Sequence, residues 1–274
     1  MAVSMADITK LRKLTGAGMM DCKNALNETN NDIEAAVEII RKKGQAVAAK
    51  REDREASEGC VLSSNKDGFA AVVALKCETD FVAKNQGFVA LTQQILDAAI
   101  EAKAKSIEEV NALTINGKNI AELIVEEIGK TGEKMELGYY EFVEAPSTTS
   151  YNHLGNKLAT IVGFNIAGID NQVGRDVAMQ VASMNPVSVC REDVPQNIVA
   201  QELEIGREKA RQEGKPEAIL EKIAEGRLNK FFKESVLMEQ EFVKDPSLSI
   251  EAYLKKQNAD LKAISFKRVN LNED

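Results

Sequence analysis

The stretch Cys77-Glu78-Thr79-Asp80-Phe81-Val82-Ala83-Lys84-Asn85 joins two segments of different periodicity. Residues 69–76, which precede it, are apolar and include two adjacent valines, a pattern that predicts a strand. Residues 87–100, which follow it, carry apolar side chains at helical spacing. Because Thr79 and Asp80 are both favourable N-cap residues, the stretch predicts a capped corner between a strand and a helix.

Phe81 has two interpretations in this corner. An acid beside an aromatic residue at an accessible corner is typical of a probe that contacts a partner. However, Phe81, Phe88 and Ile95 recur every seven residues, so Phe81 can also continue the apolar stripe of the following helix. The spacing alone leaves both alternatives open.

The same stretch resembles the signature of the elongation factor Ts family, in the form Cys-x-Thr-Asp-Phe-Val-Ala-Lys-Asn. A second stretch, Thr15-Gly16-Ala17-Gly18-Met19-Met20-Asp21-Cys22-Lys23-Asn24-Ala25-Leu26, also resembles the family. Further similarity, at Tyr151-Asn152-His153 and at Phe242-Val243, extends the resemblance over nearly the whole chain. The resemblance implies a cytoplasmic translation elongation factor, which exchanges guanine nucleotide on the GTPase elongation factor Tu without a cofactor or chemistry of its own.

The resemblance also implies which residues contact the GTPase. Asp80 and Phe81 would form a wedge that enters the GTPase domain and disturbs its site for Mg²⁺ and phosphate, so that GTP can rebind. The residues implied for this exchange wedge are Thr79, Asp80, Phe81, Val82 and Lys84. The residues implied for other partner contacts are Met19, Met20, Lys23, Ile128, Gly129, His153 and Val243.

The chain departs from the family pattern at two places. After Ile128-Gly129 the family commonly has Glu-Asn, but this chain has Lys130. After Val243 the family often has an apolar residue, but this chain has Lys244. The contacts expected at Lys130 and Lys244 are therefore open.

The composition argues against several other classes of protein. The net charge of −8 and the absence of Trp argue against direct binding of nucleic acid through phosphates or base stacking. No apolar run is long enough for a membrane span, and no secretory signal is expected. The four cysteines form no Cys-x-x-Cys pair and the chain has one histidine, so no metal site is expected.

Two other functions stay open. In one, the chain is an adaptor without exchange activity, which binds partners through its N-terminal helices and a helical arm and buries Phe81. In the other, the chain is an enzyme that uses Cys22, Cys77 or His153, although no nucleophile and base stand at a recognisable spacing. A measurement of GDP release from elongation factor Tu separates these functions from exchange.

The N-terminal segment, 1–50, predicts three short helices. The first has an apolar face formed by Ile8, Leu11 and Leu14, and the third is expected to stop at Gly44. The family resemblance implies a bundle of the ubiquitin-associated type here.

The middle of the chain predicts a duplicated unit of antiparallel sheet plus helix, and thus an α+β fold. In the first half, a hairpin turn at Asp67-Gly68 precedes the strand 69–76. In the second half, an approach strand at 138–143 precedes a strand at 158–166. Residues 107–128, between the halves, are expected to be mostly helical and to end at Gly129.

The segment 194–236 predicts an antiparallel helical hairpin that projects from the core and is interrupted at Gly214-Lys215-Pro216. It resembles the coiled-coil arm of the family. The predicted division of the chain is a three-helix domain at 1–50, a linker at 51–58, core subdomain N at 59–137, core subdomain C at 138–193 and 237–274, and the arm at 194–236.

Overall fold

The computed structural model describes residues 3–273, so Met1, Ala2 and Asp274 of the predicted terminal domains lie outside the described residues. Helices and small sheets both occur, which confirms the α+β prediction. The chain forms two compact units. Unit 1 comprises Met1–Leu62, Val73–Glu141 and Asn270–Asp274, and unit 2 comprises Ser63–Val72 and Phe142–Val269. The predicted five-part division stays a prediction.

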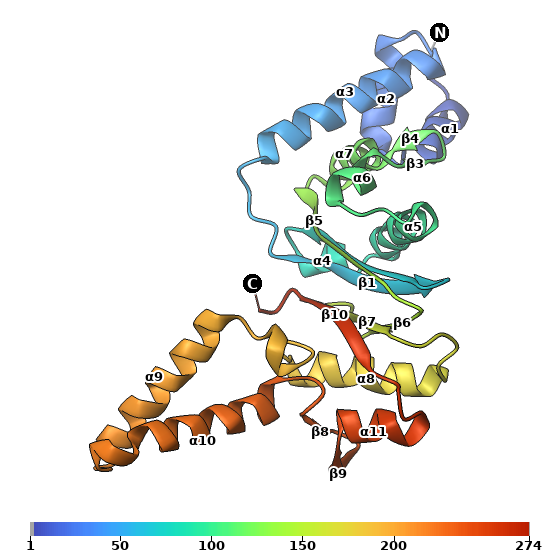
Figure 1. The fold of residues 1–274 in the computed structure, drawn as a ribbon. Coiled ribbons are helices and arrows are strands. Elements are labelled where there is room, and N and C mark those ends of the chain that lie inside the picture. Colours follow the sequence, from blue (N-terminus) through green and yellow to red (C-terminus); the bar gives the residue numbers. More distant parts are fainter. Residues whose placement is uncertain (1–2, 274) are drawn as a thin grey trace. The chain divides into compact units, whose positions relative to one another are not determined.

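Figure 1 shows the order of the elements along the chain. The helices are α1 (Met5–Thr15), α2 (Met19–Glu28), α3 (Ile33–Arg51), α4 (Asp80–Ala83), α5 (Gln86–Ala102), α6 (Ile107–Ala112), α7 (Ile120–Thr131), α8 (Asn171–Met184), α9 (Gln196–Gln212), α10 (Glu217–Ser235) and α11 (Ile250–Gln257). The strands are β1 (Glu58–Lys66), β2 (Phe69–Cys77), β3 (Thr114–Ile115), β4 (Lys118–Asn119), β5 (Met135–Glu144), β6 (Ser147–Asn152), β7 (Leu158–Phe164), β8 (Glu241–Phe242), β9 (Asp245–Ser249) and β10 (Ala263–Asn270).

The first three helices, α1 to α3, share a small apolar core in unit 1. Ser4 begins α1 by accepting a hydrogen bond from the Asp7 N–H, as an N-cap serine does. Leu14 is exposed and does not join Ile8 and Leu11 in this core, contrary to the prediction. The buried members of this core are Ile8, Leu11, Ala17, Cys22, Ala25, Leu26 and Ala36.

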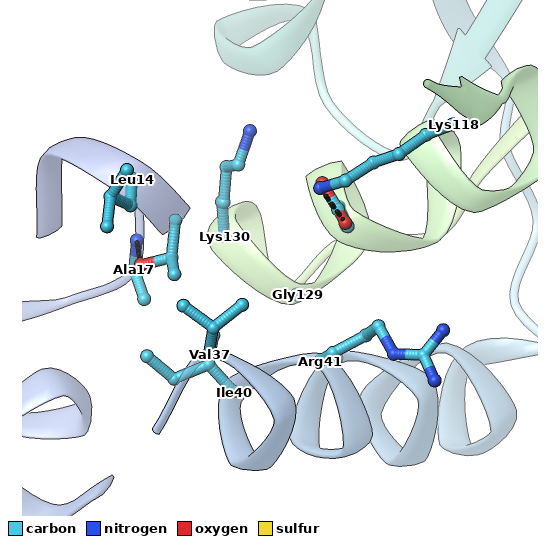
Figure 2. A pocket seen from close by; sticks show the side chains of 11 residues that line it. Leu14, Ala17, Val37, Ile40, Arg41, Lys118, Gly129 and Lys130 are labelled. Carbon is cyan, nitrogen blue, oxygen red and sulfur yellow. Dashed lines mark hydrogen bonds and ion pairs between the residues drawn. The ribbon is translucent and has the colours of Figure 1, made fainter. Parts of the chain in front are cut away.

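The third helix does not stop at Gly44, as predicted, but continues to Arg51. Gly44 lies where α3 packs against α7, opposite Gly129, which is labelled in Figure 2. A Cβ added to Gly129 of α7 would stand only 2.8 Å from the Gly44 Cα. The glycine therefore permits the close approach of two helices, and its intrinsic cost in a helix does not end α3.

The segment between the two halves is interrupted by a hairpin. Asn116 and Gly117 have φ of 52° and 80° and form the two-residue turn between β3 and β4, as Asn-Gly pairs favour. The helix α7 then continues past the expected end at Gly129 to Thr131, and Gly132 caps it in the left-handed conformation. The prediction missed the hairpin and placed the helix end too early.

The first sheet has the strand order β1-β2-β5. Asp67 and Gly68 both have positive φ and connect β1 to β2, which confirms the predicted hairpin turn. The strand expected at 138–143 belongs to β5 and hence to this first sheet, so its assignment to the second half is wrong. Phe142 of β5 stacks on Phe69 of β2 with 5.6 Å between the ring centroids, which helps hold β5 against β2.

The second sheet has the order β10-β7-β6 and lies in unit 2, apart from Asn270 at the end of β10. The strand β6, which was not predicted, pairs antiparallel with β7 from Ser147 opposite Phe164 to Asn152 opposite Ala159. The helix α8 packs on this sheet. The buried core between them and the C-terminal elements contains Val162, Phe164, Val173, Val177, Ala178, Val181, Leu237, Met238, Phe242, Ile250, Leu254, Leu261 and Ala263.

The predicted helical hairpin is formed by α9 and α10, which contact each other and are joined at the turn seen in Figure 1. Small residues allow the two helices to approach closely at one point, where a Cβ added to Gly206 would stand 3.0 Å from the Ala224 Cα. Ile219, near the start of α10, is exposed. Val194, Phe232 and Val236 form a separate buried cluster where the arm begins and ends.

Candidate functional site

The corner after β2 contains two separately capped helices. The Thr79 Oγ1 accepts a hydrogen bond from the Val82 N–H at 3.4 Å and starts the single turn α4. The Asn85 side chain then caps α5. As a result Phe81 is 84% exposed, whereas Phe88 of α5 is 1% exposed, and the interpretation that Phe81 continues the core stripe is wrong.

Two charged residues beside Phe81, Asp80 and Lys84, pair with each other. Lys84 donates a hydrogen bond of 2.6 Å to the carboxylate of Asp80, one helical turn earlier. This hydrogen bond raises the pKa of Lys84 above its ordinary value. Val82, the residue after Phe81, is half-buried.

Thr79 is held by a residue that the sequence analysis did not single out for function. The Glu133 carboxylate accepts hydrogen bonds from the Thr79 N–H at 3.0 Å and from the Thr79 hydroxyl at 2.7 Å. Since the two residues are 54 positions apart, no local spacing indicates this contact.

The predicted contact residues of α2 lie on its outer surface. Met19 and Met20 are both exposed large apolar side chains, and Lys23 is also exposed. Cys22, between them in sequence, faces the small core. Two adjacent exposed methionines present polarizable and adaptable apolar surface, which suits contact with a protein.

Ile128 and Gly129 lie on α7 but offer little side-chain surface. Ile128 is 5% exposed, and Gly129 faces Gly44 of α3. Lys130, where the chain departs from the family pattern, bonds to Glu127 at 2.7 Å and lays its aliphatic stem over Gly16. The contacts of Lys130 are thus within the chain.

A small cavity lies between α1, α3 and α7 (Figure 2), with a volume of about 50 Å³. Leu14, Val37 and Ile40 contribute apolar side chains to its wall, and Arg41 and Lys118 contribute cationic ones. Ligand pockets usually enclose about 300–1,000 Å³. The cavity is therefore too small for a nucleotide or a comparable cofactor.

In unit 2, His153 lies in the turn between β6 and β7. Its Nδ1 is 2.9 Å from the Tyr151 hydroxyl, and both His153 and Leu154 are exposed, Leu154 to 92%. His153 was a predicted contact residue, whereas Leu154 beside it was not.

Val243, also in unit 2, lies in a segment that is hydrogen-bonded to polar side chains of α8. Val243 is 42% exposed, and its N–H donates to the Gln180 Oε1 at 2.9 Å. The adjacent Lys244 donates to the Asp176 carboxylate at 2.6 Å, and the Tyr253 hydroxyl donates to the same carboxylate at 2.9 Å. Lys244, the second departure from the family pattern, therefore pairs within the chain.

The environment of Asp176 shifts its pKa in two directions. Burial raises the pKa, whereas hydrogen bonds from Lys244, Tyr253 and Gln172 lower it, and the net pKa is below the ordinary value. Asp176 is therefore an ionised anchor for the segment that carries Val243.

The residues considered for catalysis do not form a catalytic grouping. The thiols of Cys22 and Cys77 are buried and donate to the backbone carbonyls of Ala17 and Thr79. Hydrogen bonding to Asp193 and burial raise the pKa of the Cys190 thiol to about 11, so it is not a ready nucleophile at neutral pH. Across residues 3–273, no three His, Cys, Asp or Glu side chains are grouped as metal ligands.

The helices of the described residues are all too short or too polar to cross a membrane.

Comparisons with known proteins match both the corner and the remainder of the chain. The family model described as Elongation factor TS matches residues 78–273. Elongation factor Ts of Porphyromonas gingivalis is 60% identical over 275 aligned residues, which cover 100% of both chains. Elongation factor Ts of Azobacteroides pseudotrichonymphae is 57% identical over 99% of each chain, and that of Bacteroides fragilis is 42% identical over 100% of each. Because these similarities span the full length and include the corner from Thr79 to Lys84, the chain belongs to the elongation factor Ts family.

Proposed function

We propose that this chain is a guanine-nucleotide exchange factor, which binds elongation factor Tu carrying GDP and promotes the release of GDP. Membership of the family supports the coarser statement, that the chain is a translation elongation factor and not an enzyme. The observation that carries the finer proposal is the position of Phe81, which is 84% exposed on a separately capped turn. A large aromatic side chain held in solvent next to an acid is suited to a protein pocket.

In the proposed mechanism, Phe81 enters an apolar pocket of the GTPase domain and Asp80 lies beside the element that is displaced. Full burial of a phenylalanine contributes about 1.5–3 kcal/mol, which offsets part of the cost of moving a helix. Mg²⁺ requires a nearly octahedral set of ligands, and in such GTPases it bridges the phosphates and the protein. A small displacement of its protein ligands therefore weakens the binding of both metal and nucleotide.

Thermodynamic linkage explains how the cycle proceeds without chemistry in this chain. If the factor lowers the affinity of the GTPase for nucleotide, nucleotide lowers the affinity for the factor by the same ratio. Free GTP can therefore displace the factor and complete the exchange.

The remaining predicted contacts would anchor the complex. Met19, Met20 and Lys23 would hold the GTPase through the outer surface of α2, and His153 and Val243 would supply contacts from unit 2. Since the side chain of Ile128 is buried, Ile128 and Gly129 would act through the backbone of α7. The proposal has the chain act in the cytoplasm, without membrane or direct nucleic-acid contact.

The test is the release of fluorescent GDP from elongation factor Tu in the presence of excess unlabelled nucleotide. We expect substoichiometric amounts of the chain to accelerate release, because each molecule is set free by incoming nucleotide, and we expect the chain alone to hydrolyse no GTP. A release rate that stays unchanged at saturating chain would show that the protein binds, if at all, as an adaptor.

A further inference from the structure

Two residues, Glu78 and Thr79, connect the end of β2 to the start of α4. Both form hydrogen bonds with the adjacent residues Glu133 and Lys134. The Glu133 carboxylate binds the N–H and the hydroxyl of Thr79 with its two oxygens, at 3.0 and 2.7 Å. The Thr79 Oγ1 in turn accepts from the Val82 N–H inside α4. Because one carboxylate restrains both the backbone and the side chain of the cap, the first turn of α4 has a fixed orientation.

The neighbouring residue Glu78 is held by a matching set of contacts. Its side chain is 18% exposed, and its Oε1 accepts a hydrogen bond of 2.6 Å from the Lys134 N–H. The Arg51 guanidinium, at the end of α3, donates to both Glu78 oxygens at 3.2 and 3.1 Å. Charge-assisted hydrogen bonds of this kind are among the strongest in proteins.

These contacts join two connecting segments of unit 1. Glu133 and Lys134 link α7 to β5, just as Glu78 and Thr79 link β2 to α4. Each connection is a short segment outside the helices and strands, and the two are crosslinked by the contacts Glu133–Thr79 and Lys134–Glu78. Arg51 adds the last turn of α3 to the same network.

From this geometry we propose that Glu133 is a positioning residue for nucleotide exchange: it holds Thr79 so that Phe81 stands in the orientation that enters the GTPase. Glu78 and Arg51 support the same orientation. The inference rests on the exchange function proposed above. It adds that the wedge is pre-ordered by a carboxylate from α7–β5, so that the complex does not have to order it on binding.

The first experiment measures the mobility of the corner in the free protein. Since the chain has no Trp, Phe81→Trp introduces a single indole whose fluorescence anisotropy reports motion at this position on the nanosecond timescale. In that background, we expect Glu133→Ala to lower the anisotropy clearly and Glu133→Gln, which keeps one oxygen acceptor, to lower it less. Glu126→Ala is the matched control, because Glu126 lies on α7, shortly before Glu133 in the chain, but bonds to Lys118.

The second experiment measures GDP release with Phe81 retained. We expect Glu133→Ala to lower the maximal rate constant about tenfold, which corresponds to about 1.4 kcal/mol in activation free energy. We expect the concentration for half-maximal effect to change little, because Met19, Met20 and the contacts of unit 2 still anchor the complex. Glu133→Gln should recover part of the rate, and Glu126→Ala should behave as the wild type.

The outcomes separate the two proposals. If the wild type accelerates GDP release but Glu133→Ala changes neither the anisotropy nor the maximal rate, the positioning role is wrong. If Glu133→Ala lowers the anisotropy but not the maximal rate, exchange does not depend on a fixed orientation of the corner. The positioning role of Glu133 is then also wrong. If the wild type itself does not accelerate release, the proposed function fails. A Glu133→Ala protein that is unfolded is replaced in both measurements by Glu133→Gln, for which a wild-type rate and anisotropy overturn the proposal.

Discussion

The chain passes from a buried strand into a helix at two corresponding places, and the two corners use their apolar residues in opposite ways. After β2, the single turn α4 separates the strand from α5, and Phe81 is exposed. After β7, the chain passes through Gly168, which has a φ of 70°, and Asp170 caps the long helix α8 directly. Ile169 in that second corner packs against the core of unit 2.

The difference comes from the number of caps. The second corner has one cap, because Asp170 accepts from the N–H groups of Gln172 and Val173, and α8 begins at once. The first corner has two, at Thr79 and Asn85, and the short helix between them turns its aromatic residue outward. Similar strand-to-helix corners thus place Ile169 against a core in one half and Phe81 in solvent in the other.

The largest expected loss of stability in the first corner is at Phe88, not at Phe81. Phe88 is 1% exposed, and Phe88→Ala should lower the free energy of unfolding by about 3–5 kcal/mol, the usual cost of such a cavity. Denaturant unfolding followed by circular dichroism measures this change. A loss below about 1 kcal/mol would mean that α5 does not depend on this residue for its packing.

In the second corner, Ile169→Ala should cost about 2 kcal/mol, the low end for isoleucine truncation, because Ile169 is only partly buried. The folded fraction should still promote GDP release at the wild-type rate. If Ile169→Ala left stability unchanged but abolished exchange, the contrast between the two corners would be reversed.

The two halves also differ in the surroundings of an aspartate. The dependence of folding stability on pH in the acid range tests this difference. Asp80 is paired at the surface with Lys84, whereas the Asp176 side chain is 9% exposed on α8. The pKa of Asp176 is lower in the folded chain than its ordinary value, so ionised Asp176 stabilises the fold above an unfolded pKa of about 3.9. This contribution is lost as the pH falls below about 4 and through the folded pKa.

Unfolding experiments between pH 6 and pH 2 measure this contribution. Asp176→Asn should lose less stability over the acid range than the wild type. Lys244→Met removes one hydrogen bond that lowers the pKa of Asp176 but leaves the burial that raises it. The variant should therefore lose stability at a higher pH than the wild type. If the free energy of unfolding fell in the same way with pH in all three proteins, the Lys244 hydrogen bond would not affect the ionisation of Asp176.

Local signals predicted those parts of the fold that depend on neighbouring residues. The apolar run of β2, the Asp67-Gly68 turn and the Gly214-Lys215-Pro216 break each act through their own backbone preferences. The Asn116-Gly117 hairpin carried the same kind of signal, so that element was predictable although it was missed.

Other features depend on parts of the chain that meet only in the folded protein. Gly44 has the local appearance of a helix stop, but α3 continues because Gly129 of α7 packs on it. The strand β6 is rich in serine and threonine and lacks the apolar alternation of a strand, and its pairing with β7 determines it. For the site, the motif indicated Asp80 and Phe81, but nothing near Thr79 indicated Glu133, since the contact spans 54 positions.

The most direct test of the account compares stability and exchange in Phe81→Ala. Because Phe81 is exposed, the free energy of unfolding should stay within about 0.5 kcal/mol of the wild type. The maximal rate of GDP release from elongation factor Tu should nevertheless fall by about tenfold or more, since the loss of even about 1.4 kcal/mol of wedge energy has that effect. A Phe81→Ala protein that is strongly destabilised, and whose folded fraction still releases GDP at the wild-type rate, would contradict the assignment of Phe81 as the exchange wedge.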